Sequence, residues 1–342
     1  MITREFEEKN KGGTPDKNAP VWCMDSGVGG ISVLREAARL LPQERFVFFG
    51  DSANAPYGMK TTEEVRELTL NAVADADMHY HPKAFVIACN TATTAAVKVM
   101  RSLYPGRIIV GIEPALKPAA LGVQQEAVRT SIEKSQDAMC AGRYAAVGSG
   151  QEGKRRRVLV LATPLTIKEE KFHALLKRYE EMCDVIPLGC PGLMEYAESG
   201  NLDSPETDAF VKSLIGQYAG EVDAVVLGCT HYPFLRGPIA RALSLSDSAV
   251  YDGGYGTAKN LKRLLSDAGL LRDASAAGQA AGESAGGCAD ESSERERRGP
   301  NIARNAYVNI DDAWLDGHVI FESSLPGEAG EERIALCRKL MK

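Results

Sequence analysis

The chain has 342 residues, of which 44% are hydrophobic and 25% charged, and its formal net charge is -6. This is the composition of an ordinary globular protein, long enough for two domains. A negative charge balance provides no basic field to attract nucleic acid or an anionic membrane surface. The charged start "MITREFEEKNKGG" is unlike a secretory signal, and no apolar stretch approaches the about 20 residues of a membrane helix. We therefore expect a soluble, cytoplasmic protein without nucleic-acid or membrane partners.

The predicted elements alternate after an expected disordered leader, residues 1–20. "APVWCMDSGVGGISVLREAARLL" predicts a strand, a Gly-rich turn and an amphipathic helix. "ERFVFFGDSANAPYG" predicts a second strand and a polar turn, and "TTEEVRELTLNAVADADM" a helix with a capping-box start. Later strands are predicted at "KAFVIACN", "RIIVGIEP", "RRRVLVLATP" and "DAVVLGCT". Their continuous apolar runs indicate burial on both faces, so the pattern predicts an α/β fold with mainly parallel sheets.

Two segments interrupt this pattern. Residues 123–156 separate two buried strands and end in a basic run. Residues 272–303 are rich in Ala, Gly, Ser and charge and contain almost nothing to bury. We expect both to be insertions outside the fold, the second of them disordered.

Chemically distinctive side chains gather where the predicted strands end. Ligands of open α/β sheets bind beyond the carboxyl ends of the strands. Here those ends carry "MDSGVGG", "GDSANAPYG", "ACNTATT", "ATPLT" and "GCTHYP". Together these turns offer backbone N–H groups, hydroxyls, an amide, a carboxylate and two thiols, which suits a small, multiply charged ligand.

The turn "DSGVGG" is uninformative alone. No Lys follows where a P-loop requires one, and the glycine spacing departs from the dinucleotide pattern. A tight strand-to-helix turn explains the glycines. It does not explain the Asp25–Ser26 pair at the mouth of the strand.

Eight scattered cysteines form no C-x-x-C pair, and without an export signal free thiols are expected. Two of them, Cys89 and Cys229, follow buried strands and precede short polar side chains. Besides simple packing, three chemistries would use them. A zinc site with His231 lacks the usual ligand spacing. A Cys–His hydrolase would need Cys229 and His231 side by side, although they are two apart on an extended segment. Two opposed acid/base groups would serve the inversion of a carbon centre.

The motifs "DSGVGG", "GDSANAPYG", "ACNTATT" and "GCTHYP", in this order and at these separations, resemble the cofactor-independent aspartate/glutamate racemases, in particular the glutamate racemases. The resemblance covers most of residues 21–270. It implies two pseudo-symmetric α/β domains with the active site in the cleft between them. Domain one would comprise residues 21–112 and 232–322, and domain two residues 113–231.

The resemblance also implies functional residues. Cys89 would act on D-glutamate and Cys229 on L-glutamate. The substrate would be held by Asp25, Ser26, Tyr57, Gly58, Asn90, Thr91, Thr230 and His231. Thr163, Thr166 and Glu198 are possible supporting residues, although "GCPGLMEYAESG" departs from the family pattern around Glu198.

The implied activity is interconversion of L- and D-glutamate, supplying D-glutamate for peptidoglycan. It would need neither pyridoxal phosphate nor a metal ion, and family members are usually homodimers. Two alternatives remain open: racemisation of aspartate, since one methylene discriminates by only about 1–3 kcal/mol, and non-catalytic binding of an acidic metabolite or a protein.

Overall fold

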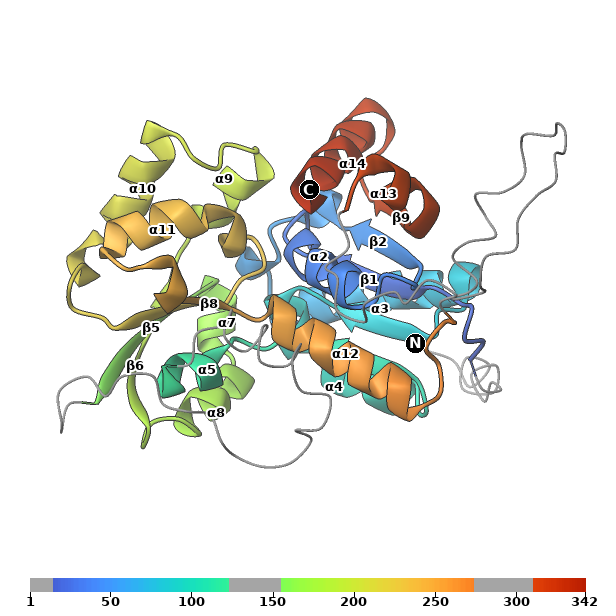
Figure 1. Cartoon of the computed structure of the whole chain (residues 1–342), viewed down its shortest axis with the longest axis horizontal. Helices are drawn as coiled ribbons and strands as arrows, with labels where there is room; N and C mark the ends of the chain where they lie inside the picture. The colour runs from blue at the N-terminus through green and yellow to red at the C-terminus, as the bar shows by residue number, and fades with distance from the viewer. Residues whose placement is uncertain (1–14, 123–154, 274–309) are drawn as a thin grey trace, which may run out of the picture.

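In a computed structural model, residues 15–122, 155–273 and 310–342 are described. They form two parallel sheets, each between two layers of helices (Figure 1). The first sheet has the order β4-β3-β1-β2-β9 and the second β6-β5-β7-β8. The strands are β1 (Val21–Asp25), β2 (Phe46–Gly50), β3 (Ala84–Ile87), β4 (Ile108–Gly111), β5 (Arg156–Ala162), β6 (Cys183–Gly189), β7 (Ala224–Leu227), β8 (Val250–Asp252) and β9 (Val319–Ser323). The predicted α/β class is confirmed.

The first sheet is buried on both faces, as its apolar strands require. Val21 and Cys23 of β1 pack toward one helical layer, while Trp22 and Met24 pack toward the other. The helices of the first layer are α2 (Ile31–Leu40), α12 (Gly254–Asp267), α13 (Asp312–His318) and α14 (Gly327–Met341). Those of the second are α3 (Thr62–Tyr80) and α4 (Asn90–Leu103). The capping box predicted at the start of α3 is present between Thr61 and Glu64.

The second sheet is enclosed in the same way. One face packs on α9 (Leu193–Glu198), α10 (Pro205–Ile215) and α11 (Arg236–Leu243). The other packs on α5 (Leu116–Leu121) and α8 (Glu170–Lys177), and α7 (Pro164–Lys168) follows β5. Short 3₁₀ helices complete the described elements: η1 (Ser52–Asn54), η2 (Tyr57–Met59), η3 (Gly216–Tyr218), η4 (Tyr232–Leu235) and η5 (Asp247–Ala249).

The structure differs from the expected boundaries at several points. Strand β8 pairs with β7, so the chain stays with the second sheet through Asp252 instead of leaving it at residue 232. The first sheet gains a covering helix, α14, beyond the expected end at residue 322. Residues 15–20, expected in the leader, pack on the body, where the Lys17 carbonyl accepts a hydrogen bond from Lys83. Most of 1–20, 123–156 and 272–303 lies outside the described residues.

A buried ion pair ties distant segments together at the amino end of β3. Lys83 and Glu44 have fully buried side chains and form a salt bridge. Lys83 also donates a hydrogen bond to the carbonyl of Leu270, and Glu44 accepts one from the backbone N–H of Arg272. The segment after α12 is thereby held against the first sheet.

Removing one member of this pair should destabilise the fold. We expect Lys83→Met to lower the free energy of unfolding by about 3–5 kcal/mol, because the Glu44 carboxylate stays buried without its countercharge. The double variant with Glu44→Leu should regain much of that loss. Urea unfolding monitored by circular dichroism measures both, and equal stability of wild type and Lys83→Met would contradict the expectation.

Candidate active site

The predicted site residues come together where the carboxyl ends of the two sheets meet. Asp25 is the last residue of β1, and Cys89 follows β3 by two positions. Cys229 follows β7 by two positions, and β3 and β7 are both interior strands of their sheets. Cys89 is 5% exposed and Cys229 6%. Each sheet therefore brings one buried thiol to the shared edge.

A buried hydrogen bond joins the two edges. Thr230 follows β7, and its hydroxyl donates a hydrogen bond to Asp25 Oδ1 at 2.9 Å. Asp25 Oδ2 accepts the backbone N–H of Gly27 at 3.0 Å. The Ser32 hydroxyl of α2 donates to the Thr230 carbonyl at 3.0 Å. Sequence reasoning did not identify Ser32, because a serine in the first turn of a helix is common.

Complete burial raises the pKa of Asp25 above its usual value, although nearby His231, the Thr230 hydroxyl and the Gly27 N–H oppose that effect. A buried carboxylate is costly unless a positive group lies beside it. The closest such group is His231, whose Nε2 lies 4.0 Å from Asp25 Oδ2. Asp25 is thus positioned to gain from a further cation beside it.

The second thiol lies in a chain of polar contacts. Cys229 Sγ is 3.6 Å from His231 Nδ1, and His231 Nε2 is 2.6 Å from Glu198 Oε1. Cys229 and His231 therefore lie side by side, although only one residue separates them in the sequence. His231 adopts a helical backbone conformation at the start of η4, so the chain turns back after Cys229 instead of continuing extended.

Glu198 lies between the two sheets. Its Oε1 also accepts the backbone N–H of Val28 at 2.8 Å, so it contacts the Gly-rich turn of the first sheet. Burial alone would raise the pKa of Glu198, but hydrogen bonds from His231 and Val28 and the charges of His231 and Arg333 lower it overall. Burial alone would lower the pKa of His231, but hydrogen bonds to Cys229 and Glu198 raise it well above its usual value. The arrangement favours an ionised pair.

The glycines of "DSGVGG" are explained by close approach. A Cβ on Gly27 would lie 1.9 Å from Glu198 Oε1, and one on Gly29 would lie 2.4 Å from His231 Nδ1. Neither glycine has a positive φ. Their absent side chains are needed for the second sheet to approach the first, and not for a tight turn.

The environment of Cys89 differs from that of Cys229. Its Sγ accepts the backbone N–H of Ala92 at 3.4 Å as the N-cap of α4, and lies 3.8 Å from Ser26 Oγ. Burial is the largest effect and, together with the charge of Asp25, raises the pKa of Cys89 to about 12. Cys89 is therefore a protonated thiol in this conformation.

Hydroxyl groups from both sheets form a third cluster. Thr91 Oγ1 lies 3.1 Å from Thr163 Oγ1 and 3.2 Å from Thr166 Oγ1. A Cβ on Gly58 would lie 2.7 Å from the Thr163 side chain, so the "PYG" turn packs against the same cluster. The buried Tyr57 hydroxyl donates to Asp51 at 2.6 Å. Asn90 is buried, and its Oδ1 has no hydrogen-bond partner in the described part of the chain.

The geometry bears on the zinc site and the Cys–His chemistry that the sequence left open for the thiols. Within residues 15–122, 155–273 and 310–342, no three His, Cys, Asp or Glu side chains are grouped as a metal site would require. No helix in these ranges is long and apolar enough to cross a membrane. The close Cys229–His231 pair fits a thiol that exchanges a proton.

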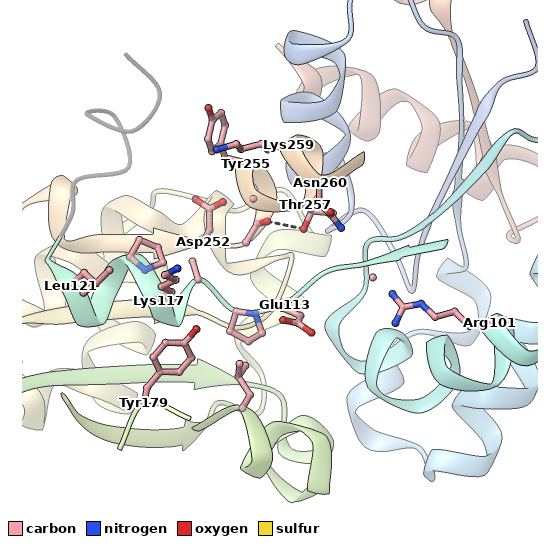
Figure 2. A pocket seen from close by; sticks show the side chains of 17 residues that line it. Arg101, Glu113, Lys117, Leu121, Tyr179, Asp252, Tyr255, Thr257, Lys259 and Asn260 are labelled. Atoms are coloured by element: carbon pink, nitrogen blue, oxygen red, sulfur yellow. Dashed lines mark hydrogen bonds between the residues drawn. The ribbon is translucent and has the colours of Figure 1, made fainter. Parts of the chain in front are cut away.

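A separate pocket of about 480 Å³ lies among α4, β4, α5, α8, β8 and α12. Figure 2 shows its polar lining, which includes Arg101, Glu113, Lys117, Lys259 and Asn260. Neither Cys89 nor Cys229 lines this pocket. It is distinct from the thiol cluster.

The family model described as Asp/Glu/Hydantoin racemase matches residues 30–255. The chain belongs to this racemase family. The glutamate racemase of Clostridium botulinum (strain Alaska E43 / Type E3) is 40% identical over 256 residues, 75% of this chain and 87% of the relative. That of Clostridium novyi (strain NT) is 41% identical over 249 residues, 72% and 83% of the two chains.

Solved structures of the racemase family share the fold. Escherichia coli glutamate racemase, in complex with L-glutamate and the activator UDP-MurNAc-ala, superposes with a TM-score of 0.58 at 28% identity. The match covers 72% of this chain and 83% of that one. In this racemase-family chain, Cys89, Cys229, Thr230 and His231 lie within the segment that the family model matches, whereas Asp25 precedes it.

The ionised His231–Glu198 pair makes the stability of this racemase-family chain depend on pH. The pKa of folded His231 is raised, so its contribution is full below the unfolded value of about 6.5 and is lost as pH rises through the folded value. The pKa of folded Glu198 is lowered, so its contribution is present above about pH 4.3 and is lost on acidification.

We therefore expect His231→Gln to reduce the free energy of unfolding most near pH 6 and progressively less toward pH 9. Urea titrations of both proteins across this range measure the difference. The matched control is His79→Gln, which removes an exposed histidine whose partner is exposed Asp75. A penalty for His231→Gln that stays constant or grows toward pH 9 would contradict the assigned ion pair.

Proposed function

We propose that this chain is a glutamate racemase that inverts the α-carbon with two thiols and without a cofactor. The observation that carries the proposal is the placement of Cys89 and Cys229. They come from different sheets, both are buried, and both lie beside the Asp25–Thr230 hydrogen bond. Glutamate racemases that are about 40% identical over more than four fifths of their length support the same activity.

The Cys229 side supplies the base for L-glutamate. His231 in its protonated form places a positive charge and an N–H donor beside Cys229 Sγ, at 3.6 Å. Glu198 holds the other ring nitrogen and balances the charge of the imidazolium. The thiolate removes the α-proton from one face of the substrate.

The Cys89 side supplies the acid in the same turnover. Its thiol is protonated, because burial and the Asp25 charge raise its pKa to about 12. It donates a proton to the opposite face of the carbanion, which yields D-glutamate and leaves a Cys89 thiolate. Cys229 has taken up one proton and Cys89 has released one. In the reverse reaction, from D-glutamate, Cys89 is therefore the base and Cys229 the acid.

The remaining cluster residues are proposed to hold the substrate. Asp25 is placed for the ammonium group, because its buried carboxylate gains from a second cation. Ser26, Asn90, Thr91 and Thr230 offer donors for the carboxylates, and Thr163 and Thr166 support Thr91. Tyr57 and Gly58 close the cluster from the first sheet.

Burial of these groups stabilises the transition state. Carbanion charge is held by fixed dipoles in a site that excludes water, where such interactions are strongest. Helix α4 begins directly after Cys89, and the partial positive charge of the helix N-terminus favours an anion there. Because both thiols are buried, the two sheets must separate for substrate to enter. A homodimer in the cytoplasm, supplying D-glutamate for peptidoglycan, completes the proposal.

A direct assay distinguishes the candidate substrates. We expect purified protein to abolish the circular dichroism of L-glutamate without added cofactor, and to act far more slowly on L-aspartate. Cys89→Ala and Cys229→Ala should each lower the rate of racemisation by at least about a thousandfold, since each removes one partner in proton transfer. Cys190→Ala, which removes another buried thiol, is the control. Faster turnover of aspartate would transfer the proposal to aspartate racemisation, and inactivity toward both would overturn it.

A further inference from the structure

The C-terminal helix reaches the thiol cluster through the side chain of Arg333. Arg333 of α14 forms a 2.9 Å salt bridge to Glu198 Oε2 and also donates to the main-chain carbonyl of Glu198. Glu198 Oε1 serves His231 and the Val28 N–H. The two carboxylate oxygens are therefore divided between the active-site histidine and Arg333.

This contact joins elements that belong to different sheets. Helix α14 contributes Cys337, Leu340 and Met341 to the core of the first sheet. Helix α9, which ends at Glu198, packs in the core of the second. Figure 1 shows α9 and α14 facing each other where the two halves adjoin. Arg333 thus fixes Glu198 from the opposite half of the molecule.

The side chain of Glu198 could adopt other rotamers if its hydrogen-bond partners did not restrain it. Its side chain is 11% exposed and has three rotatable bonds, so it could turn from the cluster toward solvent. The hydrogen bond to His231 restrains one oxygen, while Arg333 restrains the other oxygen and the backbone. A carboxylate held at both oxygens fixes the plane and the position of the group that orients the imidazole.

Resting on the proposed racemase function, we propose that Arg333 is a positioning residue for the Cys229 half of the reaction. It holds Glu198 so that Glu198 aligns His231 with the Cys229 sulfur. It touches neither thiol, and it lies outside residues 30–255, the segment that the family model matches. A helix beyond that segment thereby sets the alignment of one of the two bases.

The charge of Arg333 and its positioning of Glu198 would have opposite consequences for the protonation of His231. The proposal can therefore be tested without an activity assay. If Arg333 contributed only its charge, its removal would leave Glu198 in place and favour the imidazolium of His231. If Arg333 positions Glu198, its removal releases the carboxylate, and His231 loses the partner that stabilises its charged form. The groups that face His231 are Cys229, Glu198 and Asp25.

The first measurement is the titration of His231 by NMR in wild type, Arg333→Met and Arg338→Met. The chain has five histidines, and the His231 signal is assigned by its loss in His231→Gln. Arg338→Met is the matched control. It removes another arginine of α14 together with its ion pair to Asp316. We expect the midpoint of His231 to fall in Arg333→Met and to stay at the wild-type value in Arg338→Met.

The second measurement is kinetic. Arg333→Met should lower kcat/KM by about ten- to hundredfold, as expected when a reacting group is displaced by about 1 Å. The deuterium isotope effect on kcat/KM should rise with α-deuterated L-glutamate, because transfer to Cys229 becomes limiting. It should fall toward unity with α-deuterated D-glutamate, whose label goes to Cys89. A general loss of folded protein would lower the rate without this opposed change. Arg333→Lys keeps the charge and should be intermediate.

A double variant tests whether Arg333 acts through Glu198. Adding Arg333→Met to Glu198→Gln should cost little beyond Glu198→Gln alone, since contacting residues do not contribute additively. An unchanged or raised His231 midpoint, equal impairment by Arg338→Met, or additive losses would overturn the proposal. If wild type does not racemise glutamate, the proposed function fails, whereas the His231 titration still decides whether Arg333 positions Glu198.

Discussion

The buried hydrogen bond from Thr230 to Asp25 joins the carboxyl edges of the two sheets, and the site depends on this junction. Each sheet alone exposes one thiol at the end of an interior strand. Only when the edges meet do Cys89, from one sheet, and Cys229, from the other, both lie beside the Asp25–Thr230 hydrogen bond. The bare backbone at Gly27 and Gly29 permits this approach, because any side chain there would collide with Glu198 or His231.

The two thiols are chemically unequal although the motifs around them look alike. Cys89 has a hydroxyl and a backbone N–H beside it, and burial keeps it protonated. Cys229 has a histidine beside it, backed by Glu198. In the proposed mechanism Cys89 acts as the acid and Cys229 as the base when L-glutamate is the substrate, and the roles are exchanged for D-glutamate.

The sequence predicted much of this arrangement because the chemistry lies in short segments directly after buried strands. Cys89, Asn90 and Thr91 follow one strand, and their meeting with Asp25 is a consequence of parallel sheet geometry. What it did not predict depends on contacts between distant segments. Strand β8 is only three residues long and pairs with β7 because of tertiary packing. Arg333 is an unremarkable arginine on a helix surface, and only the folded chain places it beside Glu198.

Each thiol is proposed to serve one face of the α-carbon, and α-deuterium exchange in deuterated water tests this division directly. In Cys229→Ala, Cys89 should exchange the α-proton of D-glutamate alone, while Cys89→Ala should exchange only L-glutamate. Mass spectrometry after chiral separation reads the label in each enantiomer, without requiring inversion. Exchange confined to one enantiomer in each variant is the expected result. Exchange into both enantiomers by either variant, or retained inversion, would mean that a single base reaches both faces and would contradict the two-thiol mechanism.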